Sequence, residues 1–116
     1  MHELGITQGI VDRARETAVE HDAGRITDVY VRMTPAADFT ESSVAMYFEL
    51  LTQDDDFFRG AALHVEHAPL PAACLDCGQE FTAAVPGAVC AHCGSENIAF
   101  AAEAPMIQLT DVAVED

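Results

Sequence analysis

The first part of the chain repeats apolar residues at helical spacing. The apolar positions that would share one side of a helix over residues 3–21 are Leu4, Ile10, Val11, Ala14 and Ala18. Polar residues such as Asp12 and Glu16 would lie on the opposite side. A recurrence every three or four residues predicts an amphipathic helix, and we expect Gly24 to end it.

The next two segments differ in period. The stretch RITDVYVRM alternates, with Val29, Val31 and Met33 on one face, and predicts a strand. After the break TPAADF, either Asp38 or Thr40 can cap a second helix. The apolar stripe expected on that helix consists of Val44, Tyr47, Phe48 and Leu51.

A short acidic run and a pair of prolines divide the remainder. We expect QDDDF to be a solvated loop that leads to a second strand, AALHVEHA, with Leu63 and Val65 facing inward. Pro69 and Pro71 then mark a boundary. The tail MIQLTDVAV again has strand character, and we expect it to rejoin the first sheet because it has no evident partner nearby.

This order of elements predicts an α+β fold. Two helices would pack on a three-stranded sheet, and a four-cysteine module would be inserted before the last strand. We expect residues 1–70 and 104–116 to form the α+β domain and residues 71–103 to form the inserted module. A chain of 116 residues suits one small domain that carries such a module.

Charge is the most unusual bulk property of the chain. The chain has twenty acidic residues, five arginines and no lysine, which gives a formal net charge of −15. A nucleic acid or an anionic membrane needs a basic footprint, so neither is an expected partner. Salt screens charge repulsion, and the Debye length falls to about 3 Å at 1 M. We therefore expect an acidic surface of the halophilic type.

The chain shows neither an apolar run of membrane-spanning length nor the features of a signal peptide. We therefore expect a cytoplasmic protein. The sequence does not distinguish a monomer from a homodimer.

The four cysteines follow the spacing C-x2-C-x12-C-x2-C in CLDCGQEFTAAVPGAVCAHCG. Each C-x-x-C can direct two thiolates at one ion, and a glycine follows each pair where the chain must turn. Four thiolates suit structural Zn²⁺, so we predict a zinc ribbon whose folding energy comes largely from the metal. The predicted zinc ligands are Cys74, Cys77, Cys90 and Cys93.

Other chemistry is open to the same cysteines. Two disulfides would suit a secreted protein, and a mononuclear iron centre uses similar C-x-x-C pairs, although typically with a longer spacer. His92, which lies between Cys90 and Cys93, could replace a thiolate. His64 and His67 are three residues apart in a predicted strand and would face opposite ways, so they make a poor chelate.

The N-terminal MHE offers a second kind of metal site. The α-amine of Met1, the backbone nitrogen of His2 and its imidazole can close adjacent chelate rings on one ion. Such a nitrogen set suits Ni²⁺ or Cu²⁺, which favour square-planar or tetragonal geometry. Glu3 could orient the imidazole or supply an oxygen. The alternative interpretation is that His2 and Glu3 are ordinary residues at the start of a helix and bind no metal.

MHELGI at the start, the helix–strand–helix–strand order and CLDCG…CAHCGS together resemble the HypA/HybF family of hydrogenase maturation factors. The resemblance extends over essentially the whole chain. It implies nickel on His2, with Met1 and Glu3 contributing, as transient cargo, and structural zinc on the four cysteines. The chain departs from the family pattern at TPAAD and at Ala91, and neither position contains a predicted metal ligand.

The resemblance implies a nickel metallochaperone, not an enzyme. It also implies a maturation GTPase as partner and the large subunit of [NiFe]-hydrogenase as recipient, with urease as another possible recipient. The chain offers no Ser/His/Asp or Cys/His catalytic arrangement. Two rival classes use the same cysteines: a zinc-ribbon module of the transcription or translation machinery, and a small iron redox protein. Residues 74–97 contain neither lysine nor arginine, which disfavours the first rival.

Overall fold

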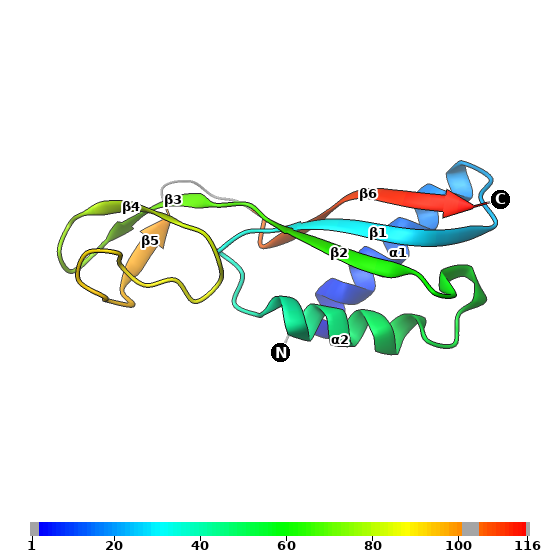
Figure 1. Cartoon of the computed structure of the whole chain (residues 1–116), viewed down its shortest axis with the longest axis horizontal. Helices are drawn as coiled ribbons and strands as arrows, with labels where there is room; N and C mark the ends of the chain where they lie inside the picture. Colours follow the sequence, from blue (N-terminus) through cyan, green and yellow to red (C-terminus); the bar gives the residue numbers. More distant parts are fainter. Residues whose placement is uncertain (1–2, 101–104, 116) are drawn as a thin grey trace. The chain divides into compact units, whose positions relative to one another are not determined.

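A computed structural model describes residues 3–100 and 105–115 of the chain. The helices are α1 (Glu3–Glu20), α2 (Glu41–Thr52) and the short 3₁₀ helix η1 (Asp56–Phe58) (Figure 1). The strands are β1 (Arg25–Met33), β2 (Ala62–His67), β3 (Leu70–Cys74), β4 (Glu80–Ala83), β5 (Ile98–Phe100) and β6 (Ile107–Glu115). The predicted α+β class is confirmed.

The chain divides into two compact units. The first comprises Met1–Arg32, Phe39–Glu66 and Gln108–Asp116, and the second comprises Met33–Asp38 and His67–Ile107. Each unit is built around one three-stranded sheet, with the strand orders β2-β1-β6 and β4-β3-β5. Because β6 pairs with β1, the chain returns to the first sheet after the cysteine-containing segment, as the sequence predicted.

The first unit covers one face of its sheet with helices. Val29 and Val31 of β1 are buried, whereas the alternating residues Tyr30 and Arg32 are exposed. Helices α1 and α2 pack against each other. The core residues they supply are Ile10, Val11, Ala14 and Ala18 from α1, and Val44 and Phe48 from α2.

Two details of α1 correct the sequence-based expectations. Leu4 does not join the buried stripe: it is 48% exposed, and Thr7 is buried in the stripe instead. Thr7 tolerates burial because its hydroxyl donates to the carbonyl oxygen of Glu3 at 2.7 Å. The left-handed residue at the helix end is Asp22 (φ 54°), not Gly24, and the N–H of Ala23 donates to Ala18 at 3.0 Å.

The structure also defines the N-cap of α2 and the contacts of the acidic run that follows this helix. Thr40 is the N-cap, and its hydroxyl accepts from the N–H of Ser43 at 3.2 Å. The predicted solvated loop at QDDDF is only partly correct. Asp55 caps η1 and forms an ion pair with Arg15 of α1, which ties the run to the first helix.

The second unit contains a sheet that the sequence did not predict. β3 is the central strand, with Ala72 opposite Phe81 of β4 and Phe100 of β5. Pro71 lies inside β3. The ladder tolerates it because Pro71 has a register partner only in β4, and the pairing with β5 begins at Ala72. Among the described residues, no helix is both long and apolar enough to cross a membrane.

Candidate metal centre

The fold of the second unit brings the four cysteines together. Their sulfur atoms all lie within 4.8 Å of one another. Cys74 Sγ is 3.6 Å from Cys93 Sγ, and Cys77 Sγ is 3.7 Å from Cys90 Sγ. Both of these distances join one C-x-x-C pair to the other, so the two pairs face a common centre.

Each C-x-x-C pair is part of a tight turn, and we call residues 74–78 and 90–94 the first and second knuckle. Gly78 and Gly94 both have φ of +77°, the left-handed conformation predicted for a sharp turn. Their N–H groups donate to the carbonyl oxygens of Cys74 and Cys90 at 3.0 and 2.9 Å. Backbone N–H groups also point at sulfur, since that of Cys77 lies 3.4 Å from Cys74 Sγ.

The sulfur positions fit a tetrahedral metal ion. With a zinc–sulfur bond of about 2.3 Å, the edge of a regular tetrahedron is about 3.8 Å, close to the two distances between the knuckles. The same distances exclude disulfide bonds in this structure, where all four cysteines are free. Four converging thiol groups form the donor set that Zn²⁺ prefers in closed structural sites.

Two of the thiols are unusually acidic. The backbone N–H of Cys77 lowers the pKa of Cys74 to about 6. Burial raises the pKa of Cys90, but the backbone N–H groups of Cys93 and His92 outweigh it and hold that pKa below 9.0. Hydrogen bonds to the ionised sulfur thus favour one thiolate in each knuckle.

The other two thiols are less acidic than usual. The backbone N–H of Ser95 opposes the change, but the S–H contact with Cys74 and burial raise the pKa of Cys93 to about 12. At Cys77 the N–H of Gln79 also lowers the pKa of the thiol. Burial and the neighbouring thiols nevertheless raise that pKa above its usual value. Deprotonation of all four thiols would place four negative charges side by side and therefore requires a cation, which a divalent metal ion would supply.

His92 does not join the metal ligands. Its side chain is exposed, and its ring Nε2 lies 3.4 Å from the carbonyl oxygen of Glu80. His64 is also engaged elsewhere: its Nε2 lies 2.8 Å from Asp28 Oδ1, and its ring stacks on Tyr30. The exposed His64 and half-buried His67 alternate along β2, which agrees with the expectation that they face opposite ways.

The predicted nickel site is described only at its edge. Glu3 is the first residue of α1 and is half-buried. Met1 and His2 lie outside the described residues. The structure therefore brings the four predicted zinc ligands together and leaves the N-terminal site a prediction.

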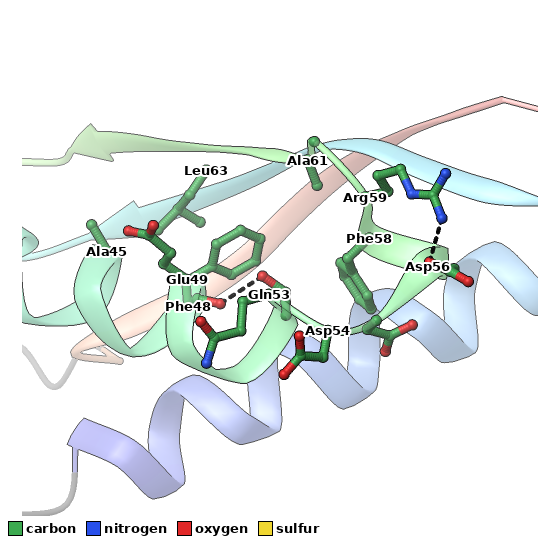
Figure 2. A pocket seen from close by; sticks show the side chains of 13 residues that line it. Ala45, Phe48, Glu49, Gln53, Asp54, Asp56, Phe58, Arg59, Ala61 and Leu63 are labelled. Atoms are coloured by element: carbon green, nitrogen blue, oxygen red, sulfur yellow. Dashed lines mark hydrogen bonds and ion pairs between the residues drawn. The ribbon is translucent and has the colours of Figure 1, made fainter.

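The first unit contains an open pocket of about 680 Å³ between the end of α2, η1 and the start of β2 (Figure 2). Phe48, Phe58 and Leu63 contribute apolar side chains to its lining. Asp56 also lines it but pairs with Arg59 at 2.5 Å. Within residues 3–100 and 105–115, the cysteines are the only group of three or more potential ligands that converge on one point, so this pocket is not a candidate metal site.

The whole chain matches one protein family. The family model for HypA, described as hydrogenase/urease nickel incorporation, metallochaperone, matches residues 1–112. The chain belongs to the HypA family. The resemblance carried by MHELGI and the two knuckles is thereby confirmed, and the family's role is nickel incorporation during hydrogenase maturation.

Individual HypA-family relatives support the assignment. The chain is 35% identical over 98 residues to hydrogenase maturation factor HybF from Klebsiella pneumoniae, covering 84% of this chain and 86% of the relative. It is 33% identical over 99 residues to hydrogenase maturation factor HypA from Solidesulfovibrio magneticus, covering 83% and 84%. The solution structure of the Ni metallochaperone HypA from Helicobacter pylori has the same fold (TM-score 0.66, 22% identity, 99% and 98% coverage).

Proposed function

We propose that this protein binds Ni²⁺ at its N-terminus and delivers it during the maturation of [NiFe]-hydrogenase. The observation that carries the proposal is the family match from residue 1 to residue 112, which takes in both the opening MHE and the four-cysteine cluster. A maturation GTPase and the hydrogenase large subunit are the proposed partners. Neither a nucleic acid nor a membrane is a proposed partner.

The proposed nickel ligands are His2 together with Met1 and Glu3. The α-amine of Met1 and the backbone and imidazole nitrogens of His2 form a nitrogen-rich set that favours Ni²⁺ over Zn²⁺. Glu3 is at the first turn of α1, where a carboxylate is favourable with the helix dipole. A site at a chain end needs few contacts to break on release, which suits a protein that passes its metal on.

The proposed resident metal is Zn²⁺ on Cys74, Cys77, Cys90 and Cys93. It would supply structural stability, because all four coordination positions are filled by protein sulfur and none is left for a substrate. With the thiolates committed to the metal, we propose that the protein is not an enzyme. The strongly acidic composition supports a cytoplasm of high salt concentration as its location.

Transfer of labelled nickel tests the delivery function. The zinc-loaded protein is charged with one equivalent of ⁶³Ni and mixed with purified GTPase, GTP and nickel-free large subunit. We expect nickel in the large subunit to exceed that obtained from the same concentration of free nickel, and His2→Ala to abolish the difference. Equal incorporation from free nickel would refute delivery by this protein.

A further inference from the structure

The two knuckles are joined by side chains as well as by the predicted metal. Asp76, the third residue of the first C-x-x-C, accepts hydrogen bonds from the hydroxyl of Ser95 and from Asn97 Nδ2, the latter at 3.4 Å. Ser95 and Asn97 follow the second knuckle in the sequence. The hydroxyl of Ser95 also accepts from the N–H of Asn97 at 3.0 Å, so the three residues form one network.

The second knuckle makes the reciprocal contact. His92 is the third residue of its own C-x-x-C, the position that corresponds to Asp76. Its Nε2 donates to the carbonyl oxygen of Glu80, which follows the first knuckle. The middle of each knuckle is thus hydrogen-bonded to the segment after the other one, and we call these contacts the cross-knuckle hydrogen bonds. A backbone bond from Leu75 to Asn97 at 2.9 Å runs beside the Asp76 network.

These contacts oppose rotation of one knuckle against the other. In a tetrahedral site the plane that contains the metal and one pair of sulfurs is perpendicular to the plane that contains the metal and the other pair. A square-planar site at the same bond length of about 2.3 Å needs the two planes to coincide, with edges of about 3.3 Å. Sulfur distances of 3.6 and 3.7 Å between the knuckles match the tetrahedral arrangement. The cross-knuckle bonds would have to break before the knuckles could flatten.

A protein that carries nickel has to keep that metal out of its structural site. Selectivity between divalent ions comes from ligand type and geometry more than from raw affinity, and thiolate ligands already suit Zn²⁺. Geometry does distinguish the two ions, since Zn²⁺ has no geometric preference from its d electrons and Ni²⁺ favours planar or tetragonal sites.

We propose that Asp76, with a smaller contribution from His92, determines the metal specificity of the four-cysteine site by holding the knuckles in the tetrahedral arrangement. This inference rests on the proposed function, because it supposes that the protein meets nickel. Asp76 and His92 are positioning residues that touch the ligand loops and not the metal. The cross-knuckle bonds keep the cargo metal out of the structural site.

Competition between the two metals on the full-length protein tests the proposal. Zinc-loaded wild type, Asp76→Ala and His92→Ala are equilibrated with a series of Ni²⁺/Zn²⁺ mixtures in high salt. Nickel at the cysteines is read from thiolate-to-nickel charge-transfer absorption, which nickel on the N-terminal nitrogens does not produce. Glu96→Ala is the matched control, since Glu96 is an exposed carboxylate of the same module with no described side-chain hydrogen bond.

We expect the nickel-to-zinc occupancy ratio at the cysteines to rise about tenfold in Asp76→Ala, less in His92→Ala, and not at all in Glu96→Ala. Asp76→Asn, which keeps one acceptor oxygen and loses the charge, should be intermediate. Tetrahedral Co²⁺ spectra establish that each variant still forms the site. If Asp76→Ala forms no site, Asp76→Asn and His92→Ala decide the question in its place.

An unchanged nickel-to-zinc occupancy ratio in these variants would overturn the proposal. A variant that loses both metals equally easily also counts as an unchanged ratio. The proposed delivery function fails by a different observation, namely equal nickel incorporation into the large subunit from this protein and from free nickel. The charge-transfer band does not report nickel at the N-terminal site, so the two failures are distinguishable.

Discussion

Arg15 of α1 and Asp55, the N-cap of η1, form an ion pair between segments 40 residues apart in the sequence. The guanidinium carbon of Arg15 also lies 5.1 Å from the ring centroid of Phe58, which is buried. One side chain therefore fixes both the acidic run and the aromatic anchor of the first unit. This contact is partly buried, unlike most of the arginine pairs in the structure.

Replacement of Arg15 by alanine is expected to destabilise the protein by about 1–2 kcal/mol, through loss of the ion pair and the cation–π contact. Urea denaturation in high salt measures the change. Arg59→Ala is the control, because its pair with Asp56 is 73% and 88% exposed, and we expect it to cost less than about 0.5 kcal/mol. Equal effects of the two substitutions would contradict the structural role of Arg15.

The same pair predicts how stability depends on pH. The hydrogen bond from Arg15 holds the pKa of Asp55 below its ordinary value of 3.8. Its contribution is therefore fully present above pH 3.8 and is lost as the pH falls through the lower pKa of the folded state. The free energy of unfolding of the wild type should fall more steeply below pH 4 than that of Asp55→Asn. Parallel curves would show that Asp55 is not stabilised by its partner.

Removal of zinc should unfold the second unit selectively. The strands β3, β4 and β5 are short, and few large apolar side chains of this unit are buried, so its stability depends on the metal. After chelation, NMR signals from β1 should keep their dispersion while those from β4 collapse. Cys90→Ser, which removes a buried ligand, should reproduce this result without a chelator. Loss of the β1 signals as well would show that the first unit also depends on zinc.

Low salt should destabilise the chain as a whole. With a formal net charge of −15, repulsion between carboxylates opposes the compact state unless counterions screen it. We expect the thermal unfolding midpoint to rise between 0.1 and about 2 M KCl. A midpoint that is independent of salt would refute the halophilic interpretation.

The long periodic segments were predictable because their spacing reflects burial in a single sheet–helix core. Val29 and Val31 alternate, and Ala14 and Ala18 repeat at four residues, as the structure requires. β3 was missed because LPAAC shows no alternation and contains a proline, and its strand character depends on pairing with β4 and β5. The end of α1 was misplaced because aspartate also tolerates the left-handed conformation.

The cysteine cluster was predictable because each pair of ligands and its glycine turn are local in sequence. The contacts of Asp76 with Ser95 and Asn97 were not, since they depend on how the two knuckles face each other. Nothing in CLDCG alone distinguishes a solvated aspartate from one that joins the knuckles. Nickel binding at the opening MHE remains a prediction from the residues and the family.

Nickel titration of the untagged, zinc-loaded protein in high salt tests the central claim most directly. The variants are His2→Ala, a chain with one extra residue before Met1, and His21→Ala as the control for an exposed histidine beyond α1. We predict one tightly bound nickel per chain in the wild type and His21→Ala, and loss of that nickel in the other two. Equal binding by all four proteins would contradict the assignment of the nickel site to Met1, His2 and Glu3.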